Sequence, residues 1–297
     1  MPAIIETQEL TRRFGSTLAV DDLNLLVPEG EIFGFLGPNG AGKTTTIRIL
    51  MNFIRPSDGK VSIFNQELRW GDYLYRKNIG FLPGDLSLPP HYSGEVFLTY
   101  WGELSGGKTP LQGRCLQALA LSRGDLGKKI RDYSSGMRQK LGITAALQHH
   151  PRLIILDEPT GGLDPLVKHS FLELLKELKA SGSTIFFSSH ILSEVEQVAD
   201  TTAIIRRGRL VVEGKIEQLK HKRHKQVSIV FKNREDLDEF IRRYPCQYDD
   251  HNLKLQLISG GDINALLKAL EGLDIADIDI IDPTLEDIFL QYYNDEN

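Results

Sequence analysis

The chain has 297 residues, 41% of them hydrophobic and 25% charged, which is enough for one large globular domain and a smaller one. Its net charge of −5 argues against a surface built to neutralise nucleic-acid phosphates. The two cysteines, Cys115 and Cys246, lack metal-site spacing and predict free thiols in a reducing compartment. No apolar run approaches the roughly 18 residues of a membrane span, and no signal-peptide pattern is present, so we expect a cytosolic chain without a span of its own.

The first part of the chain, up to about residue 219, alternates short apolar runs with helical patterns, which is typical of an α/β domain. Continuous apolar or β-branched runs predict strands inside a covered parallel sheet, and a hairpin is expected around Arg207 and Gly208. The predicted helices cover 44–52, 111–122 and 135–149, and the predicted strands cover 32–36, 153–156, 184–188, 203–205 and 210–212.

The composition changes at the basic run 221–225, and the remainder has no nucleotide-binding pattern. Its predicted order of strand, helix, two short strands, helix and strand matches the split βαβ, ferredoxin-like arrangement. A further helix is expected at 284–293, with Glu286 and Asp287 in its first turn. We therefore predict two domains, 1–221 and 222–297. The elements of the second are expected at 227–231, 234–243, around 248, and at 253–257, 263–270 and 276–281.

A glycine-rich loop follows the first predicted buried strand and precedes a predicted helix. It fits the pattern G-x-x-x-x-G-K-[ST] and consists of Gly37, Pro38, Asn39, Gly40, Ala41, Gly42, Lys43 and Thr44. Such a loop lets backbone N–H groups cradle phosphate oxygens at a helix N-terminus. The pattern predicts that Lys43 reaches the β- and γ-phosphates and that the Thr44 hydroxyl binds Mg²⁺, with Thr45 also in the phosphate-binding set. A glycine-rich turn with an incidental lysine is the alternative, and the flanking strand and helix argue against it.

An acidic pair ends the strand predicted at 153–156. Asp157 is expected at the carboxyl end of that strand, where α/β sheets bind ligands, and is therefore a candidate to hold Mg²⁺. Glu158, one residue later, is the candidate to orient or deprotonate an attacking water. A solvated Asp-Glu pair at a strand end is the alternative, which the phosphate loop disfavours.

Several ordered motifs between about residues 4 and 219 resemble those of the ATP-binding cassette ATPases. The segment 133–139 resembles the family's signature turn, and 157–165 resembles its Walker B run followed by a D-loop whose aspartate is Asp164. His190 resembles the switch histidine that contacts the γ-phosphate, and Phe14 matches the aromatic residue that stacks on adenine. The resemblance implies a P-loop NTPase cassette with a RecA-like core, a helical subdomain at about 86–149 and an antiparallel β subdomain, followed by a small α+β domain.

The resemblance also implies how the nucleotide is used. ATP and Mg²⁺ are the expected cofactors, and two ATP molecules are sandwiched between two cassettes, for which a homodimer is expected and a heterodimer stays open. Ser134, Ser135 and Gly136 of one subunit then face the γ-phosphate bound by the other, so ATP binding closes the dimer and hydrolysis opens it. Serine is also a favoured helix N-cap, and both roles can hold together.

Three positions depart from the family pattern. Ser135 and Met137 stand where the family usually has Gly and often has Gln. Gly84 holds the position of a glutamine that ordinarily contacts Mg²⁺ and the attacking water. Asp85 is a candidate to replace it as a metal ligand, and the alternative is a turn pair with water completing the metal shell.

The tail 282–290 resembles the ending of bacterial and archaeal antibiotic or multidrug exporter cassettes, which pair with separately encoded six-helix permeases. We therefore expect an export ATPase at the inner face of the cell membrane, attached through a permease, and Tyr92 is a candidate contact with it. Two alternatives stay open: a soluble cassette ATPase without a permease, and a weakly hydrolytic, nucleotide-gated regulatory module. A further alternative is that the tail pattern marks only a capped amphipathic helix.

Overall fold

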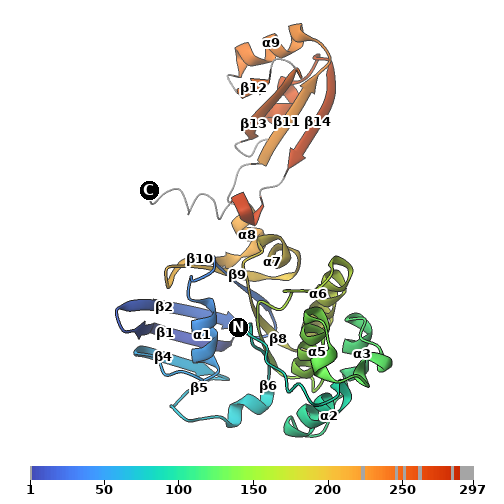
Figure 1. Cartoon of the computed structure of the whole chain (residues 1–297). Coiled ribbons are helices and arrows are strands. Elements are labelled where there is room, and N and C mark those ends of the chain that lie inside the picture. The colour runs from blue at the N-terminus through green and yellow to red at the C-terminus, as the bar shows by residue number, and fades with distance from the viewer. Residues whose placement is uncertain are drawn as a thin grey trace. The chain divides into compact units, whose positions relative to one another are not determined.

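The computed structural model describes residues 2–221, 225–244, 247–249, 252–259, 263–281 and 284–287 (Figure 1). The chain divides into two compact units, 1–216 and 217–297, so the predicted domain boundary after residue 221 falls within the second unit, at the end of a short helix. Among the described helices, none combines the length and the apolar character needed to cross a membrane.

The centre of the first unit is a six-stranded sheet in the order β10-β9-β3-β8-β7-β6, parallel except for the hairpin strand β10. Every residue of β3, β7 and β8 is buried, because helices or the second sheet cover both faces, and this explains their unbroken apolar runs. The strands are β3 (Ile32–Leu36), β6 (Ile79–Leu82), β7 (Leu153–Asp157), β8 (Thr184–Ser189), β9 (Thr201–Arg206) and β10 (Arg209–Lys215).

A second, antiparallel sheet in the order β2-β1-β4-β5 packs on the first. One apolar core joins the two sheets and helix α1, with Leu10, Val27 and Ile47 meeting Phe35 and Phe186. The strands are β1 (Ala3–Phe14), β2 (Thr17–Pro28), β4 (Asp58–Ile63) and β5 (Gln66–Glu67). The resemblance to cassette ATPases implied this subdomain, and the sheet confirms it.

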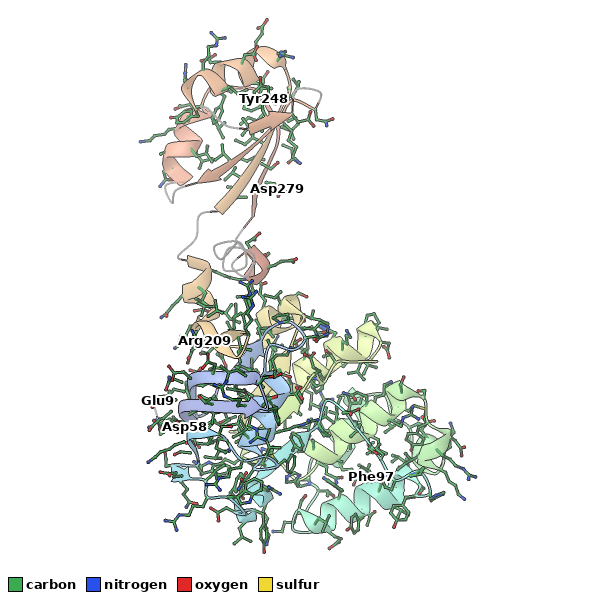
Figure 2. All side chains as sticks on the ribbon, turned by 60° about the vertical axis from the view of Figure 1, so that its left-hand side comes forward. Glu9, Asp58, Phe97, Arg209, Tyr248 and Asp279 are labelled. Carbon is green, nitrogen blue, oxygen red and sulfur yellow. The ribbon has the colours of Figure 1, made fainter. Side chains whose placement is uncertain are left out.

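Helices α2, α3 and α5 gather into a separate layer (Figure 1). Phe97, labelled in Figure 2, packs there with Leu98, Tyr133 and Leu141. The helices of the first unit and its end are α1 (Lys43–Leu50), α2 (Gly94–Leu104), α3 (Gln112–Ala118), α4 (Arg123–Leu126), α5 (Ser135–Leu147), α6 (Pro165–Ala180), α7 (Leu192–Val198) and α8 (Ile216–His221), with 3₁₀ turns η1 (Leu74–Asn78) and η2 (Ile130–Asp132).

The helix predicted at 111–122 is observed as α3, but it ends earlier than expected. Helix α3 ends at Ala118, and Ala120 adopts a left-handed φ of 49° that an α-helix does not accept. Ser122 then caps a new helix, α4, by accepting a hydrogen bond from the Asp125 backbone while Asp125 accepts one from the Ser122 N–H. The left-handed residue therefore ends the helix before the predicted end at 122, and the capping box starts α4 directly after it.

The second unit has the strand order β12-β13-β11-β14, all antiparallel, with two helices against it, which is the expected ferredoxin-like order. Val227, Ile229 and Phe231 of β11 form its core with Leu237 and Phe240. Strand β14 lies at one edge of the sheet, with Asp277 and Asp279 pairing beside β11 (Figure 2). The elements are β11 (Lys225–Phe231), α9 (Arg234–Arg243), β12 (Gln247–Asp249), β13 (Lys254–Ser259), α10 (Ile263–Ala269) and β14 (Ile275–Ile281).

The helix predicted at 284–293 is described only at its start. Residues 285–287 are helical, and Thr284 and Asp287 exchange capping hydrogen bonds, with the Thr284 hydroxyl accepting from the Asp287 N–H at 3.2 Å. The rest of that prediction, and most of the tail resemblance, lies outside the described residues.

Candidate functional site

Three neighbouring parallel strands carry the predicted site to one edge of the central sheet. Leu36 of β3 lies beside Ser189 of β8, and Asp157 of β7 lies beside Ser188. Asp157 is the last residue of β7, and the loop 37–44, Glu158 and His190 directly follow the ends of their strands. Because carboxyl ends of parallel strands share one edge, segments far apart in the sequence meet there.

The loop 37–44 adopts a backbone that requires glycine. Gly40 and Gly42 have φ of 80° and 112°, and a Cβ on Gly42 would lie 2.5 Å from the carbonyl oxygen of Ala19. Helix α1 begins at Lys43, so the loop ends at a helix N-terminus. Ala41 is buried, Pro38 and Thr45 are half-buried, and Asn39 and Gly40 are exposed. This is the geometry of an anion-binding turn.

Lys43 is buried at the strand edge, with its side chain 5% exposed. Its ammonium donates to the carbonyl oxygens of Gly37 at 2.6 Å and Pro38 at 3.3 Å, and lies 3.1 Å from Glu158 Oε1. A buried ammonium needs such partners, because desolvation otherwise costs several kcal/mol. The ion pair with Glu158 therefore joins the phosphate loop to the end of β7.

Asp157 and Glu158 are held by a serine that the sequence analysis left without a role. Ser188 Oγ donates to Asp157 Oδ1 at 2.5 Å and accepts the Glu158 N–H at 3.0 Å. Glu158 has a left-handed φ of 50°, which turns its side chain away from the strand direction. In the sequence, Ser188 stands out only as a small polar residue at the end of an apolar strand. Its role was not visible there, because its partners lie about 30 residues away.

His190 completes a three-residue cluster with Lys43 and Glu158. Its Nδ1 lies 2.7 Å from Glu158 Oε2, and its ring is about half exposed. The structure therefore brings together the three residues predicted as catalytic, with Glu158 between the other two. A carboxylate, a buried ammonium and an imidazole arranged in this way can orient a water and bind an anion.

The oxygen atoms nearby suit a hard cation such as Mg²⁺. This ion usually binds only one or two protein side chains, and water molecules and phosphate oxygens complete its coordination shell. Asp157 is 1% exposed, and with Oδ1 bound to Ser188 its Oδ2 faces Gly84, where a Cβ would lie only 3.1 Å away. Thr44 is exposed at the start of α1. The described residues contain no cluster of three or more His, Cys, Asp or Glu that would hold a metal alone. Asp85 is exposed beside Gly84 and forms no ion pair with any described residue.

The signature turn packs against the segment that follows Glu158. Ser134 caps helix α5 by accepting the Met137 N–H at 3.2 Å, and Ser135 is exposed. Gly136 packs so closely on the Gly162 backbone that a Cβ would lie 2.7 Å from its carbonyl oxygen. The turn therefore presents its serines outward while its glycine contacts the D-loop of its own chain.

Polar contacts continue this link. Gln139 Nε2 donates to the Pro159 carbonyl at 2.8 Å, and Lys140 Nζ lies 3.6 Å from Asp164 Oδ2. Asp164 caps helix α6 by accepting the Val167 N–H at 3.0 Å, and this bond, ahead of the Lys140 charge, lowers the pKa of Asp164 below its usual value. The D-loop is thus fixed at both of its ends.

Glu194 is a further buried residue of the site that the sequence analysis did not identify. It accepts hydrogen bonds from Thr160 Oγ1 at 2.6 Å and from Lys168 Nζ at 3.1 Å. Thr160 belongs to the D-loop, and Glu194 lies on α7, the helix that follows His190. The carboxylate therefore connects the segments that follow β7 and β8.

Phe14 lies at the end of β1 and is 45% exposed. The Arg12 guanidinium lies 4.3 Å from the ring centre, which orients the ring by a cation–π contact. An exposed, oriented ring can stack on a planar base.

Comparisons with known proteins agree with this geometry. Residues 20–161 match the family model described as ABC transporter, and residues 214–293 match the C-terminal domain of ATP-binding proteins like DrrA1-3. The bacitracin transport ATP-binding protein BcrA of Bacillus licheniformis is 34% identical over 98% of this chain and 97% of its own. The daunorubicin resistance ATP-binding protein DrrA3 of Streptomyces coeruleorubidus is 30% identical over 96% and 94%.

Solved structures show the same likeness for the first unit. The ATP-binding subunit of an ABC transporter superposes with a TM-score of 0.68 and 30% identity, covering 74% of this chain and 92% of its own. A dimeric bacterial ABC transporter cassette gives a TM-score of 0.63 at 25% identity, covering 71% and 98%. Both superpositions leave out about a quarter of this chain.

Proposed function

The chain belongs to the ATP-binding cassette (ABC) transporter family, and from this membership we propose that it hydrolyses ATP to drive export through a separate membrane permease. Relatives named for bacitracin transport and daunorubicin resistance support a drug, an antibiotic or a similar amphiphilic molecule as the exported substrate. The single observation that carries the enzymatic part is the cluster of Lys43, Glu158 and His190 at the edge of the sheet.

In the proposed reaction, Lys43 binds the β- and γ-phosphates, which then replace Glu158 as its counter-charge. The freed Glu158 carboxylate orients the attacking water and accepts its proton. His190 contacts Glu158 through Nδ1 and, once the carboxylate has turned to the water, can donate a ring N–H to a γ-phosphate oxygen. Mg²⁺, when bound, neutralises phosphate charge, and Thr44 and Asp157 would hold it.

Glu158→Gln tests the enzymatic part. The amide keeps the shape and can still bond to His190, but it accepts no proton, so ATP turnover should fall at least about 100-fold while ATP binding persists. Glu173→Gln, an exposed glutamate on α6, is the matched control and should keep the wild-type rate. Equal turnover of Glu158→Gln and wild type would instead favour the nucleotide-gated regulatory module.

We further propose that two copies close on two ATP molecules. The support is that Ser134 and Ser135 face outward while Gly136 is occupied by its own D-loop, so the serines are available to a second subunit. Ser135→Glu tests this, because a carboxylate at the first position of α5 suits the helix but repels a γ-phosphate. The Glu158→Gln protein should dimerise with ATP in size-exclusion chromatography, and adding Ser135→Glu should keep it monomeric. ATP-independent behaviour of both proteins would contradict the dimer.

The permease contact is proposed for an apolar groove in the helical layer, with a volume of about 380 Å³. Tyr92, Tyr100 and Trp101 line it and are 50%, 54% and 40% exposed, an unusual cluster of exposed aromatic side chains. An apolar face of a permease helix would cover them. Tyr100→Glu should abolish co-purification with a co-expressed permease, and Tyr244→Glu, an exposed tyrosine of the second unit, should not. Persistent co-purification of Tyr100→Glu would exclude this groove.

A further inference from the structure

A second cavity, unlike the apolar groove, is rich in cations. It lies between the C-terminal end of α1 and the hairpin β4–β5 and has a volume of about 320 Å³. The polar and aromatic side chains that line it are those of Asn52, Arg55, Lys60, Glu67, Arg69 and Trp70. Nothing in the proposed ATPase cycle uses this cavity.

A rigid turn forms one wall of the cavity. Asn52, itself at a left-handed φ of 53°, donates from Nδ2 to the carbonyl oxygens of Arg69 at 2.9 Å and Asp72 at 3.0 Å. The Arg69 N–H in turn donates to Asp72 Oδ2 at 2.9 Å. Two hydrogen bonds from Asn52, just after the end of α1, therefore hold the turn, and a third closes the turn on itself.

This turn exposes large apolar side chains. Trp70, Tyr73 and Leu74 are 58%, 64% and 66% exposed. These three side chains lie within five residues of a fixed turn and leave apolar surface in contact with water. The fold does not require this exposure. Binding of another surface over these side chains would be favourable, because it would remove their apolar area from water.

The cations of the cavity are available. No carboxylate of the described residues forms an ion pair with Arg55 or Arg69, and both are exposed. Lys60 pairs with Glu67 at 3.4 Å, but both side chains are more than half exposed, so water screens that pair. Two guanidinium groups with free donors at one cavity match the oxygens of a phosphate group.

The cavity adjoins the groove proposed for the permease. The Arg76 guanidinium lies 4.8 Å from the centre of the Phe53 ring and donates to the Asn52 carbonyl at 3.0 Å. Phe53 lines the groove and Asn52 lines the cavity, so adjacent residues serve both. To this extent the inference rests on the proposed function, because the groove would face the membrane partner.

We propose that this cavity binds the phosphate of an anionic phospholipid headgroup while Trp70, Tyr73 and Leu74 enter the bilayer interface. Tryptophan and tyrosine favour that interface because each has an apolar body and a polar group, and nearby Arg and Lys are attracted to an anionic leaflet. A soluble phosphate would bind the arginines but would leave the three apolar side chains uncovered. The combination therefore favours a lipid surface.

The experiment uses the full chain without nucleotide or permease, so its outcome is independent of the ATPase tests. The sequence has two tryptophans, and Trp101→Phe leaves Trp70 as the only emitter. Its emission should shift to the blue, and brominated lipid should quench it, with vesicles of phosphatidylcholine and phosphatidylglycerol. Vesicles of phosphatidylcholine alone should have little effect, and high salt should release the protein from the anionic ones.

Arg55→Gln/Arg69→Gln should weaken binding to the anionic vesicles about 30-fold, from the contribution of each cation near such a surface. The matched control Lys232→Gln/Arg242→Gln removes the same charge from exposed positions of the second unit and should bind as the parent does. Three results would overturn the proposal: equal binding to neutral and anionic vesicles, equal loss in the two double variants, or a response of Trp70 to inorganic phosphate with none to vesicles.

Discussion

Replacing Glu194 by alanine should destabilise the first unit more than any surface glutamate does. The carboxylate is 8% exposed and accepts from Thr160 at 2.6 Å and Lys168 at 3.1 Å. Thr160 is itself 3% exposed, so its hydroxyl has no water to bond to once the carboxylate is removed. Lys168 is 30% exposed and can turn to solvent.

The magnitude follows from these exposures. A buried hydrogen bond to a charged group contributes about 1.5–3 kcal/mol, and an orphaned buried hydroxyl costs about 1–3 kcal/mol. Losing the partly solvated pair with Lys168 adds less than about 1 kcal/mol. We therefore expect Glu194→Ala to lower the free energy of unfolding by about 3 kcal/mol. Glu194→Gln, which still accepts from Thr160, should cost only about 1 kcal/mol.

The free energy of unfolding can be measured by urea denaturation, with tryptophan fluorescence as the signal. Both tryptophans, at 70 and 101, belong to the first unit and report its unfolding alone. Glu173→Ala is the control: its exposed ion pair with Lys176 predicts a loss below about 0.5 kcal/mol. A double-mutant cycle with Thr160→Val should give a coupling of about 1.5 kcal/mol. A Glu194→Ala loss no larger than the control's, or a coupling near zero, would refute the reasoning.

Three further predictions concern single residues. Gly42→Ala should abolish binding of a fluorescent ATP analogue, because the new Cβ would lie 2.5 Å from a carbonyl oxygen. Gly40→Ala, whose Cβ would have no atom within 4 Å, should cost only about 1–2 kcal/mol of binding free energy. Similar losses for the two variants would contradict the steric argument. Burial raises the pKa of the Cys115 thiol to about 12. In the native Cys246→Ser protein at about pH 8, Cys115 should therefore react with Ellman's reagent roughly a thousandfold more slowly than a free thiol. A normal rate would show that the Cys115 thiol is accessible. Phe14→Ala should weaken ATP binding up to about tenfold without changing the binding of inorganic triphosphate, and equal effects on both ligands would exclude base stacking.

The parts of the fold that the sequence predicted well are those fixed by local pattern. The strand 32–36 was predicted at its observed bounds because burial on both faces leaves an unbroken apolar run. Helix 234–243 was likewise predicted at its bounds, since Asn233 caps it and basic residues end it. The ferredoxin-like order of the second unit followed from the order of such segments.

Other features depend on contacts between distant segments and leave little local signal. Strands β1 and β2 alternate irregularly because several bulges interrupt their pairing, and the sequence analysis gave them no bounds. Ser188 and Glu194 act through partners about 30 residues away, so their roles became visible only with the structure. The predicted cluster of Lys43, Glu158 and His190 was accessible from sequence because Glu158 and His190 directly follow strands and Lys43 ends a recognisable glycine-rich loop.

The edge strand β14 has a consequence for how the protein behaves in concentrated solution. An edge strand offers its backbone to other chains, and the apolar residues of β14 would favour such pairing. Antiparallel pairing of two copies centred on Ile278 sets Asp277 of each opposite Asp279 of the other, and a shift of two residues sets one aspartate opposite itself. Like charges facing each other destabilise a strand pair. The two aspartates therefore act as a built-in barrier to self-aggregation.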